Sequence, residues 1–128
     1  MRKKKANTHS LGHLGERLAS WFLSRRGYVI LEKNVRVGRS EIDLICELNN
    51  TLVFVEVKLR GTGALVDASH SVSAAQRRRI VTAAMIYARR NTTSFRALRF
   101  DVIAIEDKEC VFKIEHYPGC FGRSGELM

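Results

Sequence analysis

The segment TLVFVEVKLRG, residues 51 to 61, holds the side chains with the clearest chemical potential in this sequence. Its apolar residues alternate as in a half-buried strand, yet Glu56 and Lys58 lie two positions apart. Side chains at that spacing point to the same face of a strand. A carboxylate and an ammonium group are therefore predicted side by side on one face of an otherwise apolar strand.

A second acid is expected to join this pair. Asn49 and Asn50 separate the segment from SEIDLICEL before it, and they predict a two-residue hairpin turn because Asn tolerates positive φ. In that register Asp43 lies opposite Glu56, with Cβ atoms roughly 4.5–5.5 Å apart. Two carboxylates so placed repel, which predicts a raised pKa, a basic neighbour or a bound cation.

Two interpretations of this cluster remain open from spacing alone. One is a structural ion pair at the edge of the sheet, between Lys58 and either Asp43 or Glu56. The other is a divalent metal site, because Mg²⁺, or Mn²⁺ in its place, is held by one or two carboxylates together with waters and substrate phosphate. Lys58 would then orient the attacking water or stabilise developing negative charge.

The charge of the chain varies strongly along its length. The total is +9, but residues 1–40 and 71–100 carry +8 and +7, whereas residues 41–70 and 101–128 carry −3 each. A compact acidic segment between two basic ones favours nucleic acid as the partner, with plain solubility as the alternative. A protein of the membrane surface would more often show a basic amphipathic helix with bulky apolar residues.

Composition indicates one soluble, cytoplasmic domain. A chain of 128 residues is long enough for one core. It has no apolar run of about 18 residues and no signal peptide, so we expect no membrane association. Its three cysteines are odd in number and lack a C-x-x-C pair, which favours reduced thiols over a disulfide or a zinc site.

The elements that must position the cluster follow from periodicity and turn residues. Helices are predicted over residues 10–26 and 73–90, the first closed by Gly27. Strands are predicted over residues 28–37, 40–48, 51–59, 97–106 and 110–117, with a turn at Asp107 and Lys108 and a loop over 61–71.

The predicted order α-β-β-β-α-β-β indicates an α/β domain. Its first three strands must form an antiparallel meander, and the second helix then returns the chain to a parallel strand. The result is a mixed sheet flanked by helices. We expect a basic, flexible tail at residues 1–8, a single domain at residues 9–121 and a C-terminal tail at residues 122–128.

At these residues the sequence resembles a known superfamily. E-I-D at 41–43, a hydrophobic strand and E-V-K at 56–58 resemble the PD-(D/E)xK nucleases. More closely, GHLGERLASWFLSRRGYVILEKNVRVGRSEIDLI followed by LVFVEVKLR resembles the bacterial, uncharacterised YraN family. The resemblance covers the chain from about Leu11 to Phe121. It implies a restriction-endonuclease-like αβββαβ core, related to the Holliday junction resolvases.

The resemblance also implies roles for individual residues. Asp43 and Glu56 match the metal-binding carboxylates, and the backbone carbonyl of Val57 matches a further metal ligand. Lys58 matches the catalytic lysine, and Glu16 matches a first-helix glutamate of resolvase-like members. Those relatives also suggest a homodimer, although the sequence carries no interface signature.

Two positions depart from the family pattern. Ser40 stands where Gly is expected before E-I-D, which should affect the turn more than the metal. Gln76 stands where many relatives carry a basic residue, although its position on the stripe of Ile80 predicts that it points toward the sheet and reaches the site. Glu16 lies off the apolar stripe of its helix, so an ordinary solvated glutamate is the alternative there.

Basic side chains outside the cluster are candidate phosphate contacts. They would supply sequence-independent affinity for a polyanion. They are Lys3, Lys4, Lys5, Arg25, Arg26, Arg77, Arg78, Arg79, Arg89 and Arg90. Asp101, by contrast, interrupts an apolar strand and is expected to pair with a nearby Arg in a structural role.

Three functions are compatible with these observations. The first is a metal-dependent, structure-selective phosphodiesterase that cuts nucleic acid, with DNA favoured over RNA as substrate. The second is a nucleic-acid-binding protein of the same fold without turnover. The third is a small module whose basic faces bind an acidic protein.

Overall fold

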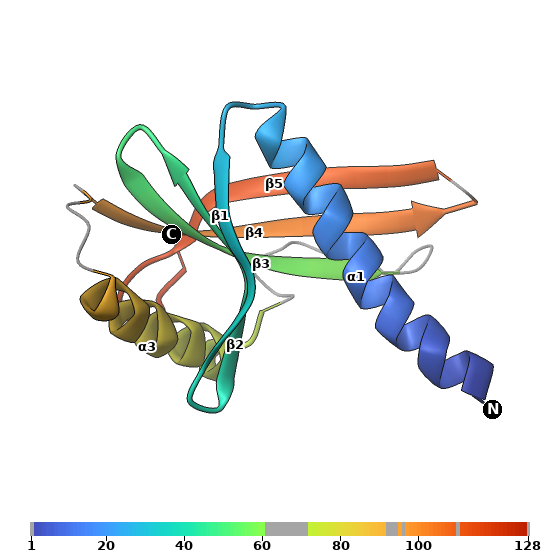
Figure 1. Ribbon diagram of the computed structural model, residues 1–128, viewed down its shortest axis with the longest axis horizontal. Coiled ribbons are helices and arrows are strands. Elements are labelled where there is room, and N and C mark those ends of the chain that lie inside the picture. Colours follow the sequence, from blue (N-terminus) through green and yellow to red (C-terminus); the bar gives the residue numbers. More distant parts are fainter. Residues whose placement is uncertain (1, 61–71, 92–94, 96, 110, 128) are drawn as a thin grey trace.

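The computed structural model describes residues 2–60, 72–91, 95, 97–109 and 111–127, with side chains from residue 13 onward. Two helices and five strands confirm the predicted order (Figure 1). They are α1 (Arg2–Ser24), β1 (Val29–Val37), β2 (Ser40–Leu48), β3 (Thr51–Arg60), α3 (Ala74–Arg90), β4 (Ala97–Lys108) and β5 (Val111–Phe121).

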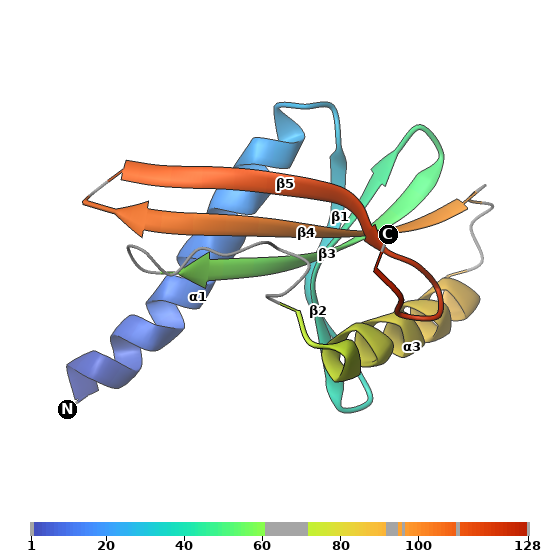
Figure 2. The same ribbon diagram turned by 180° about the vertical axis from the view of Figure 1, so that it is seen from behind.

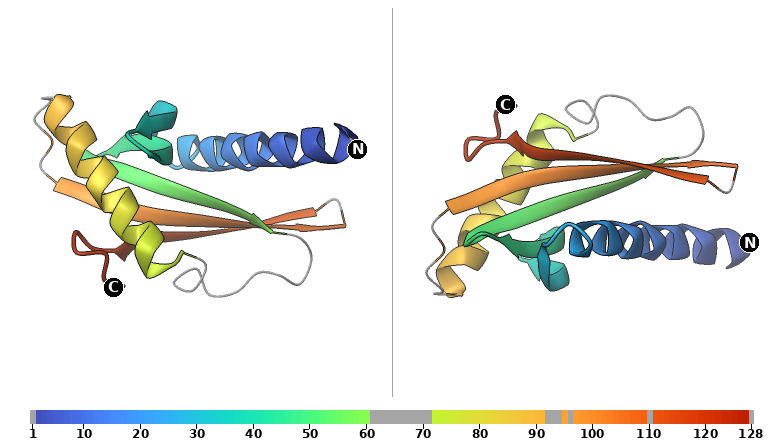
Figure 3. Two further views of the ribbon diagram at one scale, coloured as in Figure 1. Left: turned by 90° about the horizontal axis from the view of Figure 1, so that it is seen from below. Right: turned by 90° about the horizontal axis from the view of Figure 1, so that it is seen from above.

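The strands form one mixed sheet in the order β1-β2-β3-β4-β5. Every neighbouring pair is antiparallel except β3 and β4, which are parallel because α3 carries the chain across the sheet between them. Helix α1 lies along one side of the sheet and α3 crosses the other (Figure 3). Alternate strand residues therefore enter two cores, with Phe54 in the core under α3 and Val55 in the core under α1.

The β2–β3 hairpin has the predicted turn and register. Asn49 and Asn50 have φ of 49° and 62°, as a two-residue turn that matches the twist of the strands requires. Leu48 pairs with Thr51, and Ile45 pairs with Phe54. A local signal of two residues thus fixes which side chains of β2 meet those of β3.

The two strands then separate. Their paired register ends at Leu44 and Val55, whereas β3 continues alongside β4 as far as Arg60 and Glu106. In Figure 1 the β1–β2 hairpin runs steeply across the other three strands. Asp43 and Glu56 occupy the next positions after the last pair, so they lie where β2 and β3 fork.

Helix α1 differs from the prediction at both of its ends. It begins at Arg2 rather than near residue 10, through a segment expected to be a flexible tail. Residues 2–9 lack an apolar stripe, but they also lack Pro and Gly, so periodicity could not detect them as helix. The helix ends at Ser24, where Gly27, at φ 91°, and the bond from Tyr28 N–H to the Leu23 carbonyl form a Schellman cap.

The β4–β5 hairpin is longer than predicted. β4 runs to Lys108, so the turn predicted at Asp107 and Lys108 was placed too early, and it begins at Glu109, at φ 48°. β5 extends to Phe121 because a register shift between Phe100 and Val102 lets pairing continue. The segment after Phe121, predicted as a tail, folds back beside α3 (Figure 2), and Leu127 bridges to Phe121.

The remaining predictions on the fold concern thiols, the loop and membranes. Cys46 is a buried free cysteine, and burial raises its pKa to about 12, while Cys120 is buried as well. Cys110 and the loop predicted over residues 61–71 lie outside the described residues. Among the helices described, neither is long and apolar enough to cross a membrane.

Candidate metal-and-lysine site

Because β2 and β3 separate at the fork, the Val57 N–H has no backbone carbonyl of β2 as its hydrogen-bond acceptor. The Asp43 side chain takes that place, because the Val57 N–H donates a hydrogen bond of 2.8 Å to Asp43 Oδ2. The contact holds the carboxyl against the segment of β3 that carries Glu56. The predicted proximity of Asp43 and Glu56 is therefore realised, with the backbone of Val57 between them.

Gln76 links the other two polar side chains of the cluster. Its amide nitrogen donates to Glu56 Oε2 at 2.9 Å, and its amide oxygen accepts from Lys58 Nζ at 3.2 Å. Lys58 Nζ also lies 3.4 Å from Glu56 Oε2. Gln76 is in the first turn of α3, where Ser73 caps the helix by accepting from the Gln76 N–H, so its predicted orientation toward the sheet is confirmed.

The electrostatics of the site are dominated by the acids. Burial raises the pKa of Asp43 to about 8, and the nearby Glu56 carboxylate adds to that increase. Burial also raises the pKa of Glu56, although Lys58 and hydrogen bonds from Lys58, Asp43 and Gln76 partly offset it. The structure thus contains an ion pair between Lys58 and Glu56. It also contains a carboxyl group, Asp43, for which the ionised form is unfavourable.

Helix α1 brings Glu16 to the margin of this cluster. Gly15 packs against β3, where a Cβ would lie in ordinary contact, 3.5 Å from Leu59 and Val57 side-chain atoms. Glu16 contributes to the raised pKa of Asp43, and its Oε1 accepts a 2.8 Å bond from Asn34 Nδ2. Glu16 is therefore near the site and held in place, whereas its predicted catalytic role stays a prediction.

Asn34 is a site residue that sequence reasoning missed. The pairs on either side, Lys33 with Leu44 and Val35 with Ile42, place it opposite Asp43. Its φ of 53° interrupts β1. The available signal was an Asn inside a strand pattern, a residue type that adopts positive φ more readily than most.

The donor set fits a hard divalent cation. Among the described residues, no group of three or more His, Cys, Asp or Glu side chains gathers for metal binding. Mg²⁺, however, is commonly held by one or two carboxylates with waters and substrate oxygens completing its shell. Asp43 provides a carboxyl group whose charge burial and Glu56 disfavour, and Glu56 provides a second carboxylate beside it, so these residues fit the predicted ion.

The predicted phosphate contacts do not form one patch. Arg25 and Arg26 follow α1, and Arg26 stacks on the Phe22 ring at 3.6 Å. Arg89 and Arg90 are exposed in the last turn of α3, roughly 20 Å along the helix from Gln76. The first turns of α3, which carry Gln76, also carry Arg77, Arg78 and Arg79. The side chains of Lys3, Lys4 and Lys5 lie outside the described part of the chain.

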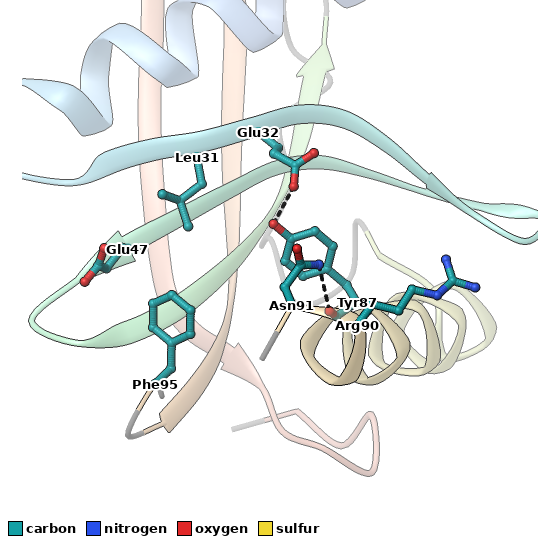
Figure 4. A pocket seen from close by; sticks show the side chains of 7 residues that line it. All are labelled: Leu31, Glu32, Glu47, Tyr87, Arg90, Asn91 and Phe95. Atoms are coloured by element: carbon teal, nitrogen blue, oxygen red, sulfur yellow. Dashed lines mark hydrogen bonds between the residues drawn. The ribbon is translucent and has the colours of Figure 1, made fainter. Parts of the chain in front are cut away.

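A hollow of about 570 Å³ lies elsewhere, at the C-terminal end of α3 (Figure 4). There the Tyr87 hydroxyl donates to Glu32, and burial together with Glu32 raises the pKa of Tyr87 to about 12. The bond joins α3 to β1. The lining lacks the lysine and the paired strand carboxylates of the fork, so we place the candidate site at the fork and not in this hollow.

Asp101 on β4 occupies a contrasting environment. It is fully buried, and it accepts two bonds from Arg99, one from the Gly119 N–H and a 2.7 Å contact from His116 Nε2. Burial raises its pKa, but the bonds from His116 and Arg99 outweigh burial and hold the pKa below its ordinary value. The predicted pairing with an arginine is confirmed.

Comparison with known proteins gives one consistent result. The model of the uncharacterised protein family UPF0102 matches residues 15–105. A UPF0102 protein of Anaeromyxobacter dehalogenans is 39% identical over 116 residues, which cover 91% of this chain and 87% of the relative. A UPF0102 protein of Dictyoglomus turgidum is 37% identical over 117 residues, 90% of this chain and 99% of the relative.

Proposed function

The chain belongs to the uncharacterised protein family UPF0102, and we propose that it is a metal-dependent phosphodiesterase that cuts nucleic acid. The observation that carries the proposal is the Asp43, Glu56, Lys58 and Gln76 arrangement at the fork. A structural ion pair explains Lys58 and Glu56. It does not explain a third polar group, Asp43, whose charge burial and Glu56 both disfavour.

Asp43, Glu56 and the Val57 carbonyl would hold Mg²⁺ or Mn²⁺. When bound, such an ion supplies Lewis-acid chemistry, which neutralises phosphodiester charge and makes water more acidic. The cation also removes the cost of ionising Asp43 beside Glu56. The two acids then act as ligands, and neither needs to titrate during the reaction.

Lys58 would act on the reacting atoms themselves. Its side chain is 19% exposed, so the ammonium group reaches the surface of the site while remaining partly shielded from water. There it would orient the attacking water or donate a hydrogen bond to a phosphoryl oxygen as negative charge develops. Gln76 is a positioning residue, since it holds Lys58 Nζ through one end of its amide and Glu56 through the other.

Nucleic acid is the favoured substrate because of the charge distribution, and DNA is favoured over RNA because the chain resembles the Holliday junction resolvases. The chain carries +9, and exposed arginines lie on both helices and in the short segment that connects α1 to β1. Such charge gives sequence-independent affinity for a phosphate backbone. The residues around the fork include no evident base-reading element, so shape would select the substrate.

The test is a cleavage assay on branched, nicked and single-stranded DNA, with matching RNA strands, in Mg²⁺, Mn²⁺ or EDTA. Lys58→Met keeps the apolar stem and removes the charge, and it should lower the cleavage rate about 10² to 10³-fold. Glu47→Gln, on the same strand as Asp43 but outside the cluster, is the matched control and should keep full activity. A wild type that cuts none of these substrates would overturn the proposal.

A DNA-binding protein without turnover is the second candidate. The observation that favours it is Gln76, which engages Lys58 and Glu56 at once, at a position where the family resemblance implies a basic side chain. Under this alternative, the wild type binds DNA with a steep salt dependence in EDTA and cuts nothing in Mg²⁺ or Mn²⁺.

A further inference from the structure

A second hollow is lined by residues that neighbour members of the candidate site in the sequence. It has a volume of about 350 Å³, and Ser40, Ala75, Arg78, Arg79 and Thr82 line it. Ser40 begins β2, three residues before Asp43, and Ala75 and Arg79 flank Gln76 on α3. The hollow, called the arginine notch below, therefore lies between the start of β2 and the first turns of α3.

The notch differs from an ordinary basic surface in its chemistry. Arg78 and Arg79 are exposed, and neither forms an ion pair with a carboxylate among the residues that the structure describes. Ser40 and Thr82 add two hydroxyl groups that can donate hydrogen bonds. Two guanidinium groups and two hydroxyls around one concave space match the oxygens of a phosphate.

The neighbouring Arg77, by contrast, uses its guanidinium group in hydrogen bonds within the protein. Its Nε donates to the Gly125 carbonyl at 2.6 Å, and its Nη1 donates to the Val72 carbonyl at 2.7 Å. These bonds tie the C-terminal segment to α3. Gly125 in turn lies against Arg78, because a Cβ at Gly125 would come within 3.2 Å of Arg78 Cγ. Arg77 thus has a structural role, and it helps to place the stem of Arg78 at the notch.

We infer that the arginine notch binds one phosphodiester group of the nucleic-acid strand, next to the phosphate held at the fork. The inference rests on the proposed function. Gln76 and Arg79 are one turn apart on α3, with Cβ atoms about 5–6 Å from each other, which is comparable to the step between neighbouring phosphates. A strand gripped at both places would present its scissile bond to Lys58 in a fixed direction.

Binding in EDTA tests the notch without any need for turnover. A fluorescein-labelled branched DNA is titrated with wild type and with Arg78→Ala/Arg79→Ala, and Lys108→Ala/Lys113→Ala is the control, which removes equal charge from exposed positions of the β4–β5 hairpin. Loss of one phosphate contact should lower the slope of log K against log salt by about 0.9. The first double variant should show that change, and the control should not.

A variant with unchanged net charge distinguishes specific hydrogen bonds to a phosphate from general attraction to the positive surface. Ser40→Ala/Thr82→Val leaves the net charge unchanged, yet it should weaken binding several-fold if the hydroxyls contact a phosphate. Equal affinity in this variant and in wild type, with equal losses in the two double variants that remove charge, would overturn the inference. Circular dichroism melts confirm that each variant is folded.

Methylphosphonate scanning locates the contact. A single neutral linkage is moved along the labelled strand, and one position should weaken wild-type binding while leaving Arg78→Ala/Arg79→Ala unaffected. No such coupled position would contradict the notch even if the protein cuts DNA. Conversely, a coupled position in a protein that cuts nothing would keep the notch and overturn the phosphodiesterase.

Discussion

Strand β3 is flanked by two aspartates that experience opposite electrostatics. Asp101 on β4 is fully buried, yet its pKa is lowered because Arg99, His116 and a backbone N–H all donate to it. Asp43 on β2 accepts a bond from one backbone N–H and has Glu56 as a neighbour, and its pKa is raised to about 8. One acid has its partners within the fold, and the other lies beside a second acid, where we propose that a cation binds.

The difference teaches how to separate a structural buried charge from a functional one. A buried ion pair with all its hydrogen bonds made needs nothing further from solvent. A carboxyl left with a like charge beside it is unfavourable by itself and is retained where it has a use. The following predictions either break this contrast or sharpen it, beginning with the largest effect.

Removing the charge of Asp101 should cost the most stability. Asp101→Asn removes the negative charge and leaves only one acceptor oxygen for the donors of Arg99, His116 and Gly119, so we expect the free energy of unfolding to fall by about 3 kcal/mol or more. Urea denaturation at pH 7 in EDTA measures it. Glu115→Gln on β5 is the control, with a change within about 0.5 kcal/mol. A decrease of less than about 1 kcal/mol in the free energy of unfolding would contradict the structural role of Asp101.

Adding a divalent ion should stabilise the folded protein, and this stabilisation should depend on Asp43. At a free concentration of Mn²⁺ about 100 times its dissociation constant, the free energy of unfolding should rise by about 2.7 kcal/mol. Asp43→Asn should abolish the increase, and Glu47→Gln should keep it. Equal stabilisation of wild type and Asp43→Asn would show that the ion binds elsewhere.

Neutralising Asp43 should stabilise the protein when no metal is present. Because its folded pKa of about 8 lies above the unfolded value of 3.8, stability contributed by this group is lost as the pH rises through that window. Asp43→Asn keeps an acceptor for the Val57 N–H, so at pH 9 in EDTA we expect a gain of roughly 2 kcal/mol. That is less than the full shift would give, since the carboxyl is partly exposed. A destabilised variant would contradict the raised pKa.

The smallest effect is expected at low pH, where Asp101 makes the free energy of unfolding fall as the pH falls, opposite to the pH dependence expected from Asp43. Asp101 has a folded pKa below its unfolded value, so its contribution is present above about pH 4 and lost as the pH falls through the folded pKa. Wild type should lose up to about 1 kcal/mol from this group between pH 4 and pH 3. Asp43→Asn should retain that loss, and Asp101→Asn should lack it.

Sequence reasoning located the parts of the site that local signals determine. The Asn49–Asn50 turn fixed the register of β2 and β3, and so placed Asp43 near Glu56. Helical periodicity placed Gln76 toward the sheet. Both signals act over a few residues, which is why they survive in a single sequence.

Other parts depend on contacts between distant segments, and the sequence contained little signal for them. The fork after Leu44 and Val55 arises from the path of β1 and β2 relative to β3. An arginine partner for Asp101 was expected, but His116 and Gly119 reach it only because β5 pairs with β4 across a register shift. Arg77 looked like its neighbours in the sequence, and only the fold-back of the C-terminal segment gives it a structural role.

The parallel pairing of β3 and β4 has a consequence for folding kinetics. Asp43 and Val57 are 14 residues apart within one hairpin, and a two-residue turn can bring them together on the microsecond scale. Gln76 can reach Glu56 and Lys58 only after the chain has crossed the sheet, which requires closure of a much longer loop. The carboxylate half of the site should therefore assemble before the half that positions the lysine, and substitutions at the Asn49–Asn50 turn should slow folding more than substitutions at Gln76.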